Sequence, residues 1–86
     1  MKVLIPSQLQ SYTEGVSEVS ANGSTLAEVL DDLDQQFPGI RFRAVDEQDR
    51  IRQHIRMFVS GKIATSINVA LNDADEVHII GALSGG

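Results

Sequence analysis

Residues 25–39 read TLAEVLDDLDQQFPG, and this stretch contains the clearest secondary-structure signal in the chain. Thr25 followed three residues later by Glu28 is a capping-box pattern, in which each side chain satisfies a backbone donor at the other position, so a helix is predicted to begin here. Pro38 and Gly39 are predicted to end it. Apolar side chains recur at spacings of three and four, which predicts one buried helix face. That face consists of Leu26, Val29, Leu30, Leu33 and Phe37.

Two β-prone stretches precede this helix. Residues 3–5 are apolar and are closed by Pro6, which has no N–H to offer a continuing strand ladder. Residues 16–21 form a second, weaker candidate strand before the turn-forming pair Asn22 and Gly23. The two stretches therefore predict a hairpin.

Two further β-prone stretches follow the helix. After a connector with a partial helical turn at residues 40–50, residues 51–60 alternate between an apolar face and a face that is basic around Phe58. Residues 76–83 predict the last strand. The piece between these strands is expected to be irregular and to bury four side chains: Ile63, Ile67, Val69 and Leu71. This order predicts an α+β fold, with one mixed sheet of four to five strands and one main helix packed across one face.

The composition limits the function classes. The chain has 86 residues, a formal net charge of −5 and no cysteine, so we expect one small domain without disulfides, thiolate catalysis or Cys-based metal sites. The negative charge repels the phosphate backbone of nucleic acids and anionic membrane surfaces. No apolar run approaches the roughly 20 residues of a bilayer span. We therefore expect a cytoplasmic protein that binds neither nucleic acid nor a membrane.

Few residues are suited to catalysis or metal binding. His54 and His78 lack a partner at metal-ligand spacing, and the acidic turn at residues 73–76 lacks the glycine and the later glutamate of a calcium loop. The sequence contains no phosphate-binding glycine motif, and no set of nucleophile, acid and base can be assembled from it. We predict that the chain is not an enzyme and that it binds no metal or cofactor by itself.

Five of the seven basic residues lie close together in this acidic chain: Arg41, Arg43, Arg50, Arg52 and Arg56. One interpretation is a solvated strand face whose charges pair locally with Asp46, Glu47 and Asp49. The other interpretation is a docking patch for an acidic partner or a nucleotide. The sequence leaves both interpretations open.

Residues 71–86, LNDADEVHIIGALSGG, resemble the end of a ThiS/MoaD-type ubiquitin-like sulfur carrier. In that family an acidic turn leads into the last strand and then into a short apolar tail that ends in Gly-Gly. Weaker matches extend over nearly the full length, at residues 5–9, 25–30, 37–39 and 58–61. Three positions depart from the family pattern: Ser60, where Asn is common; Ala74, where Gly is usual; and Gly81, where Pro often stands.

The resemblance implies a β-grasp fold over residues 1–82 and a flexible tail at residues 83–86. It also implies that a ubiquitin-activating-like adenylating enzyme, using ATP and magnesium, adenylates the Gly86 carboxylate, which then becomes a thiocarboxylate. A sulfur-accepting synthase would be the second partner. The residues expected to contact these partners are Leu83, Ser84, Gly85 and Phe58.

The resemblance leaves the sulfur acceptor open among the molybdopterin, thiamine and cysteine pathways, although the long middle section at residues 37–54 is more similar to the cysteine type. Two other functions also stay open. One is a protein modifier conjugated to lysines through Gly86, and the other is a non-catalytic interaction domain in which the Gly-Gly end is incidental.

Overall fold

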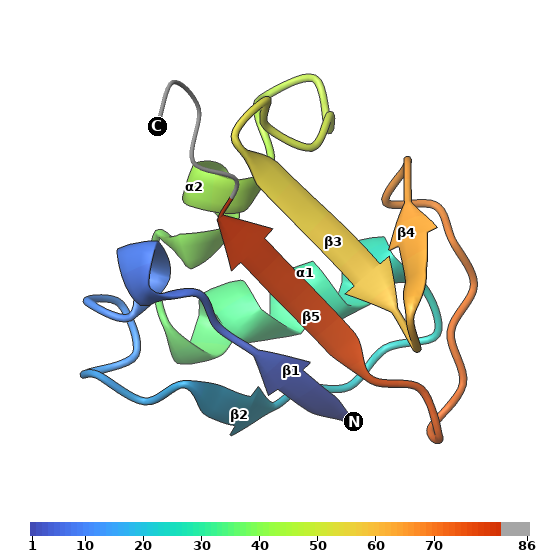
Figure 1. The fold of residues 1–86 in the computed structure, drawn as a ribbon, viewed down its shortest axis with the longest axis horizontal. Coiled ribbons are helices and arrows are strands. Elements are labelled where there is room, and N and C mark those ends of the chain that lie inside the picture. The colour runs from blue at the N-terminus through green and yellow to red at the C-terminus, as the bar shows by residue number, and fades with distance from the viewer. Residues whose placement is uncertain (82–86) are drawn as a thin grey trace.

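The structure of the chain is a computed structural model that describes residues 1–81 (Figure 1). The elements in chain order are β1 (Lys2–Leu4), the 3₁₀ helix η1 (Ser7–Leu9), β2 (Glu18–Ser20), α1 (Leu26–Gln36), α2 (Ile40–Ala44), β3 (Ile55–Val59), β4 (Lys62–Ala64) and β5 (Val77–Gly81). The α+β class is confirmed, and α2 is the partial helical turn predicted in the connector. The part of the predicted last strand that follows residue 81 lies outside the described residues.

The five strands form one mixed sheet in the order β2-β1-β5-β3-β4. β1 pairs with β2 in the predicted antiparallel hairpin, whereas β1 and β5 are parallel neighbours. The last strand of the chain is therefore the central strand of the sheet, and α1 crosses one face (Figure 1). β4 occupies part of the segment that the sequence predicted to be irregular.

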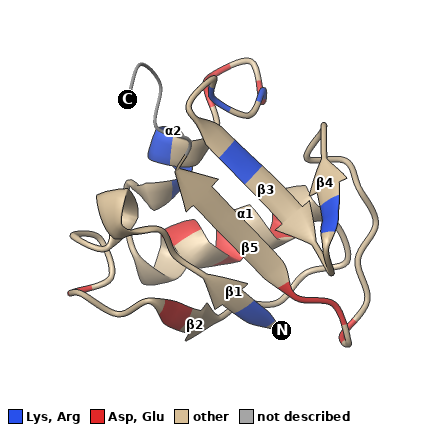
Figure 2. Cartoon of the chain, in the orientation of Figure 1, with Lys and Arg blue, Asp and Glu red and all other residues tan. Residues whose placement is uncertain are grey.

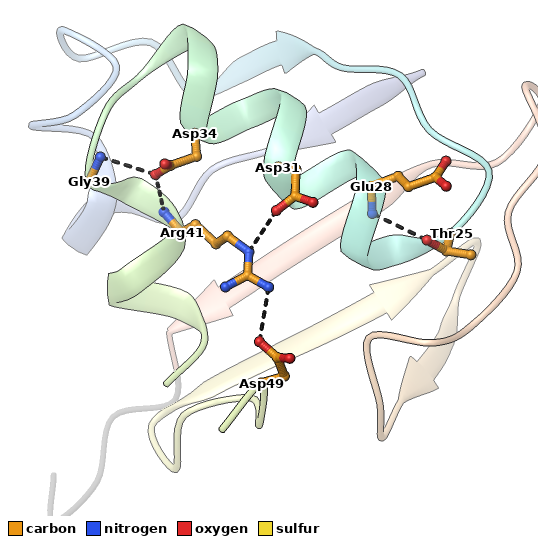
Figure 3. Close-up of polar contacts among 7 residues, drawn as sticks. All are labelled: Thr25, Glu28, Asp31, Asp34, Gly39, Arg41 and Asp49. Atoms are coloured by element: carbon orange, nitrogen blue, oxygen red, sulfur yellow. Dashed lines mark hydrogen bonds and ion pairs between the residues drawn. The ribbon is translucent and has the colours of Figure 1, made fainter. Parts of the chain in front are cut away.

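The N-terminus of α1 confirms half of the predicted capping box. The Thr25 hydroxyl accepts the N–H of Glu28 at 3.2 Å, as predicted (Figure 3). The Glu28 carboxylate, however, accepts the N–H and the hydroxyl of Ser24, each at 2.8 Å, and these bonds lower the pKa of Glu28. The first two helical N–H groups donate to carbonyls of the loop at residues 67–69. A contact far away in the sequence thus completes the cap.

The apolar stripe of α1 packs against the sheet in a single core. Four of its five predicted members are buried and Phe37 is half-buried. From the sheet, the core receives the inward side chains of all three central strands, which include Val3, Met57 and Val77. No helix within residues 1–81 combines the length and the apolar composition that crossing a membrane requires.

The burial predicted after β3 is correct in part. Ile67 and Leu71 are buried and Val69 is half-buried, but the prediction for Ile63 is wrong, because its side chain is 55% exposed. The reason is the alternation of β4, where Ala64 points into the core and Ile63 points away from it. A single strand cannot bury both neighbours on one face.

The strand predicted over residues 51–60 begins only at Ile55. Ile51 forms an isolated bridge with Val45, and the Arg52 N–H donates to the Ala44 carbonyl at 3.0 Å, so this part of the chain folds back toward α2. Residues 52–55 then turn into β3. Consequently the predicted basic face is divided: Arg52 lies beside α2, and only the part around Phe58 lies on the sheet.

Helix α2 is held in place by carboxylates of α1 and of the following loop (Figure 3). Asp34 accepts the backbone N–H groups of Gly39 and Arg41 at 3.1 and 3.2 Å. Arg41 also lies 3.0 Å from Asp31 through Nε and 3.2 Å from Asp49 through an outer nitrogen. These contacts orient the short helix that carries Arg43.

The turn before β5 is built around Asp75. Its carboxylate accepts the hydroxyl of Ser60 at 2.8 Å and the backbone N–H of Asn72 at 2.9 Å. Both bonds lower the pKa of Asp75 below its ordinary value of 3.8, the backbone bond more strongly. Ser60 itself has a left-handed backbone with φ of 47°, a conformation that Asn adopts more readily than Ser.

We expect Asp75→Asn to weaken the acid dependence of stability. A carboxyl group with a lowered folded pKa stabilises the fold above its unfolded pKa and loses this contribution as the pH falls through the folded pKa. The free energy of unfolding of the unmodified chain should therefore fall as the pH is lowered below 3.8, and that of D75N should fall less steeply. Urea denaturation over a pH series measures both slopes. Asp73→Asn in the same turn is the control, and equal slopes for D75N and the unmodified chain would contradict the prediction.

Candidate functional site

The candidate site lies at the end of the central strand. β5 is paired on both sides, with β1 through Val77 and His78 and with β3 along its whole length as far as the pair Gly81 and Ile55. The start of β5 is therefore anchored by two neighbouring strands, and its end at Gly81 is anchored by β3. The predicted reacting residue, Gly86, and the predicted contact residues Leu83, Ser84 and Gly85 lie outside the described residues.

Gly81 is packed against Gln8, which belongs to η1. A Cβ atom at position 81 would overlap the side-chain amide of Gln8. A larger residue at this position would have to displace only the end of the flexible, exposed Gln8 side chain. The contact therefore does not by itself require glycine, and the φ of Gly81 is outside the left-handed region.

A row of four side chains crosses the face of the sheet opposite α1. Its members are Leu4 on β1, His78 on β5, Phe58 on β3 and Ile63 on β4, each opposite the next in the strand register. We call this set the open-face row. Phe58, predicted from the sequence to contact a partner, lies inside the row, while Ile63 and the neighbouring Ile80 are 55% and 45% exposed. Exposed apolar side chains in such a group are typical of protein interaction sites.

Charged groups border the open-face row. Arg56 lies opposite Ile80 in the next register position, and the His78 ring lies 3.0 Å from the Glu76 carboxylate. The hydrogen bond with His78, and secondarily the charge of Lys2, lower the pKa of Glu76. An apolar centre with a polar border is the usual anatomy of a protein–protein interface.

The five clustered arginines fall into two groups. Arg41 and Arg50 pair with carboxylates: the first with Asp31 and Asp49, the second with Asp46 at 3.5 Å. The other three have no carboxylate within 4.0 Å in residues 1–81, and they donate instead to neutral oxygens: Arg43, Arg52 and Arg56. Local pairing thus describes two of the five residues.

The histidines and the acidic turn show no metal geometry. Within residues 1–81, no three His, Asp or Glu side chains are grouped so that they could hold a metal ion. The carboxylate of Asp75 is used in the hydrogen bonds that close its own turn.

Residues 3–86 match the model of the ThiS family. The chain belongs to the ThiS family. Among curated ThiS relatives, the sulfur carrier protein CysO of Mycobacterium tuberculosis is 32% identical over 89 residues, covering 98% of this chain and 96% of that protein. CysO of Mycobacterium bovis has the same identity and coverage.

Solved structures of CysO proteins are also similar to this chain over nearly its full length. A chain in the BexX/CysO complex of Amycolatopsis orientalis is 30% identical, with a TM-score of 0.90 over 99% of this chain and 98% of that chain. CysO of Mycobacterium tuberculosis has a TM-score of 0.89 at 30% identity, over 95% of this chain and 98% of that chain. The small archaeal modifier protein 1 of Methanosarcina acetivorans, at 22% identity, shares the fold with a TM-score of 0.80 over 99% and 94% of the two chains. These likenesses and the mixed five-stranded sheet confirm the predicted β-grasp fold.

Sequence reasoning found Phe58 but missed the residues around it. Ile80 and His78 alternate with the buried positions of β5, and this alternation could have assigned both to the exposed face. Leu4 and Ile63 could not have been added in the same way, because their strands are three residues long and neither shows a period. Gln8 carried no sequence signal, since its contact with Gly81 joins two positions that are far apart in the chain.

Proposed function

We propose that the chain is a sulfur carrier whose C-terminal Gly86 carboxylate is converted to a thiocarboxylate. The observation that carries the proposal is the full-length similarity to CysO proteins, with the family match continuing to residue 86. The position of β5 supports it, because the central strand gives the reacting segment a rigid starting point. The body of the carrier is residues 1–82, and residues 83–86 form the tail.

The proposed chemistry has two steps. The Gly86 carboxylate attacks the α-phosphorus of ATP, and pyrophosphate leaves as the acyl-adenylate forms. Hydrosulfide (HS−) from the sulfur source then attacks the carbonyl carbon, AMP leaves with the electron pair of the carbon–oxygen bond, and loss of the S–H proton to solvent gives the thiocarboxylate. The adenylating enzyme supplies magnesium and the groups that stabilise the phosphates, so the carrier is a substrate and sulfur donor rather than a catalyst.

The tail residues have distinct proposed roles. Gly85 and Gly86 lack side chains, so they fit a narrow channel leading to a buried ATP and adopt the backbone angles that the channel imposes. Leu83 supplies an apolar side chain that anchors the tail on the partner, and Ser84 lies between this anchor and the glycines. A tail held by Leu83 brings the carboxylate to a defined distance from the nucleotide.

The open-face row is proposed to dock the carrier on its partners. These partners are the adenylating enzyme and the synthase that accepts the sulfur, both of which act in the cytoplasm. The row extends across the strand that leads into the tail, so a partner that covers Phe58 and Ile80 is also correctly placed to receive the tail. The relatives named CysO favour a sulfur acceptor in cysteine synthesis over the molybdopterin and thiamine pathways. The Amycolatopsis structure is a complex of CysO with a second protein, BexX, and so supports docking on a protein partner.

An intact-mass measurement tests the proposed function. The chain is incubated with the adenylating enzyme from its own genome, ATP, magnesium and a sulfur source. We expect a mass change equal to the exchange of one oxygen for one sulfur, located at the C-terminus by fragmentation. An unchanged mass would contradict the proposal, and denaturation-resistant conjugates with other proteins in cells would favour the lysine-modifier function instead.

We expect Phe58→Ala to weaken binding to the adenylating enzyme about tenfold or more, because large aromatic side chains at the centre of an apolar interface carry much of its binding energy. Isothermal titration calorimetry measures the dissociation constant. Val16→Ala, which shortens an apolar side chain that is 47% exposed outside the open-face row, is the matched control and should bind normally. Equal affinities of the two variants would remove Phe58 from the docking surface.

A further inference from the structure

Arg43 and Arg52 each donate one hydrogen bond to a neutral oxygen atom, and their other guanidinium donors have no partner within residues 1–81. Arg43 donates through Nε to the Tyr12 hydroxyl at 2.8 Å, and this hydrogen bond raises the pKa of Arg43. Arg52 donates through Nε to the Phe42 carbonyl at 2.6 Å, and its guanidinium carbon lies 4.5 Å from the centre of the Phe42 ring. Within residues 1–81 the outer nitrogens of both arginines have no hydrogen-bond partner, so two oriented guanidinium groups can each still donate to a carboxylate.

Both arginines line one surface hollow. It has a volume of about 220 Å³ and is bordered by α2 and the segments that follow it: Phe42, Arg43, Glu47, Arg52 and His54. We call it the arginine hollow. Glu47 lies on its border but makes no ion pair within 4.0 Å among residues 1–81, and Asp46 is paired with Arg50. The carboxylates near the hollow therefore leave Arg43 and Arg52 without an ion-pair partner.

The arginine hollow adjoins a groove that reaches Gly81, the last described residue. Arg43 and His54 also line this groove, which has a volume of about 430 Å³ and a border that includes Gln8 and Ile55. Gln8 packs against Gly81, and Ile55 pairs with Gly81 in the sheet. A partner surface that covers the end of β5 therefore comes close to Arg43.

The charge distribution favours an acidic partner at this position. The chain carries a net charge of −5, so most of its surface repels carboxylates. Figure 2 shows acidic residues on α1 and β2, whereas α2 and β3, near the end of β5, carry basic residues and the loop between them carries both signs of charge. An acidic protein surface is therefore directed to this end of the carrier, and opposite charges speed its association.

We propose that the arginine hollow docks carboxylate side chains of the adenylating enzyme, which rests on the proposed function of the tail. Arg43 and Arg52 are the specificity residues, and each donates hydrogen bonds through its outer nitrogens to an Asp or Glu side chain of that enzyme. A nucleotide is the less suitable occupant, because the sequence contains no phosphate-binding glycine motif. Side-chain carboxylates fit a hollow of this size.

The test compares two double variants that remove the same charge. Arg43→Gln with Arg52→Gln changes the hollow, and Lys2→Gln with Arg50→Gln changes two exposed basic residues that pair with Glu18 and Asp46 within the chain. Surface plasmon resonance with the adenylating enzyme, at low and high salt, measures association rates and dissociation constants. At low salt we expect the R43Q/R52Q variant to bind about tenfold more weakly with a smaller salt dependence, and the K2Q/R50Q variant to change less than about twofold.

Several outcomes overturn the docking proposal. Equal losses in both double variants would mean that only net charge matters, and unchanged binding by R43Q/R52Q would exclude the hollow. Shifts of the Arg43 and Arg52 Nε–H NMR signals on addition of ATP alone would assign the hollow to a nucleotide. Amide NMR spectra report whether each variant is folded. If the R43Q/R52Q variant is unfolded, the single variant R52Q replaces it and is expected to bind about threefold more weakly than the unmodified chain.

The mass measurement separates this proposal from the proposed function. Sulfur transfer to the unmodified chain together with unchanged binding by R43Q/R52Q would overturn the docking proposal alone. Selective loss of binding in R43Q/R52Q without sulfur transfer to the unmodified chain would overturn the proposed function and support the hollow as a docking site.

Discussion

Deletion of Gly86 is expected to abolish thiocarboxylate formation while leaving the fold of residues 1–81 unchanged. The deletion withdraws the carboxylate by one residue, which is about 3.5 Å of extended chain. A displacement of only about 1 Å from the productive position can reduce a reaction rate about 100-fold, so a full residue places the carboxylate out of reach of the nucleotide. The intact-mass measurement after incubation with the adenylating enzyme, ATP and a sulfur source should show no product.

Two further variants make this result specific to the position of the carboxylate. Adding one residue after Gly86 should also prevent the reaction. The added residue moves the terminal carboxylate about one residue too far along the channel, and any side chain on it would obstruct the channel. Val16→Ala, which changes an exposed side chain outside the tail and the open-face row, should react at a rate within a few-fold of the unmodified chain. Sulfur transfer to the shortened chain at a normal rate would show that Gly86 is not the reacting residue.

Replacement of Leu33 by alanine is expected to lower the free energy of unfolding by about 3 kcal/mol. Leu33 is fully buried in the stripe of α1 that packs against the sheet. Truncating a buried leucine removes its transfer free energy and leaves a cavity, and such changes cost about 2–5 kcal/mol. A small domain with a total stability of about 5–10 kcal/mol loses a large fraction of its stability. Urea denaturation followed by circular dichroism measures the change.

Gln35→Ala is the matched control for the core prediction. Gln35 lies two positions further along the same helix, and its side chain is exposed, so its truncation should change the stability by less than about 0.5 kcal/mol. If Leu33→Ala cost less than about 1 kcal/mol, the space would have to be filled by rearrangement of α1 against the sheet. The carrier function should persist in L33A at temperatures where it stays folded, because the tail chemistry does not involve α1.

Much of the fold could be predicted from the residues because its signals are local. The stripe of α1, the Thr25 cap and the hairpin before it each depend on neighbouring positions and were correct. The errors occurred where the neighbours are distant. The first two helical N–H groups donate to the loop at residues 67–69, a contact that no local pattern predicts. Ile63 is exposed because β4 pairs with β3 in a register that turns Ala64 inward.

In the candidate site, too, the sequence predicted the features that depend on local motifs and missed those that depend on distant residues. Phe58 and the resemblance of the tail were accessible from sequence motifs, whereas the open-face row needed the strand register, which places Phe58 between His78 and Ile63. The arginine cluster looked like one feature in the sequence. Among residues 1–81 it divides into two arginines that are ion-paired and three that have no carboxylate within 4.0 Å.

The sequence by itself determined the α+β class, the position of the main helix and the family resemblance of the last sixteen residues. These features depend on spacing and residue type, which act over one or two turns of chain. Only the tertiary structure decided that β5 is the central strand, that Gln8 packs against Gly81, and that Arg43 and Arg52 share a hollow near the start of the tail. Strand order, burial and ion pairing are contacts between residues that are distant in sequence, and their free energies exist only once the chain has folded.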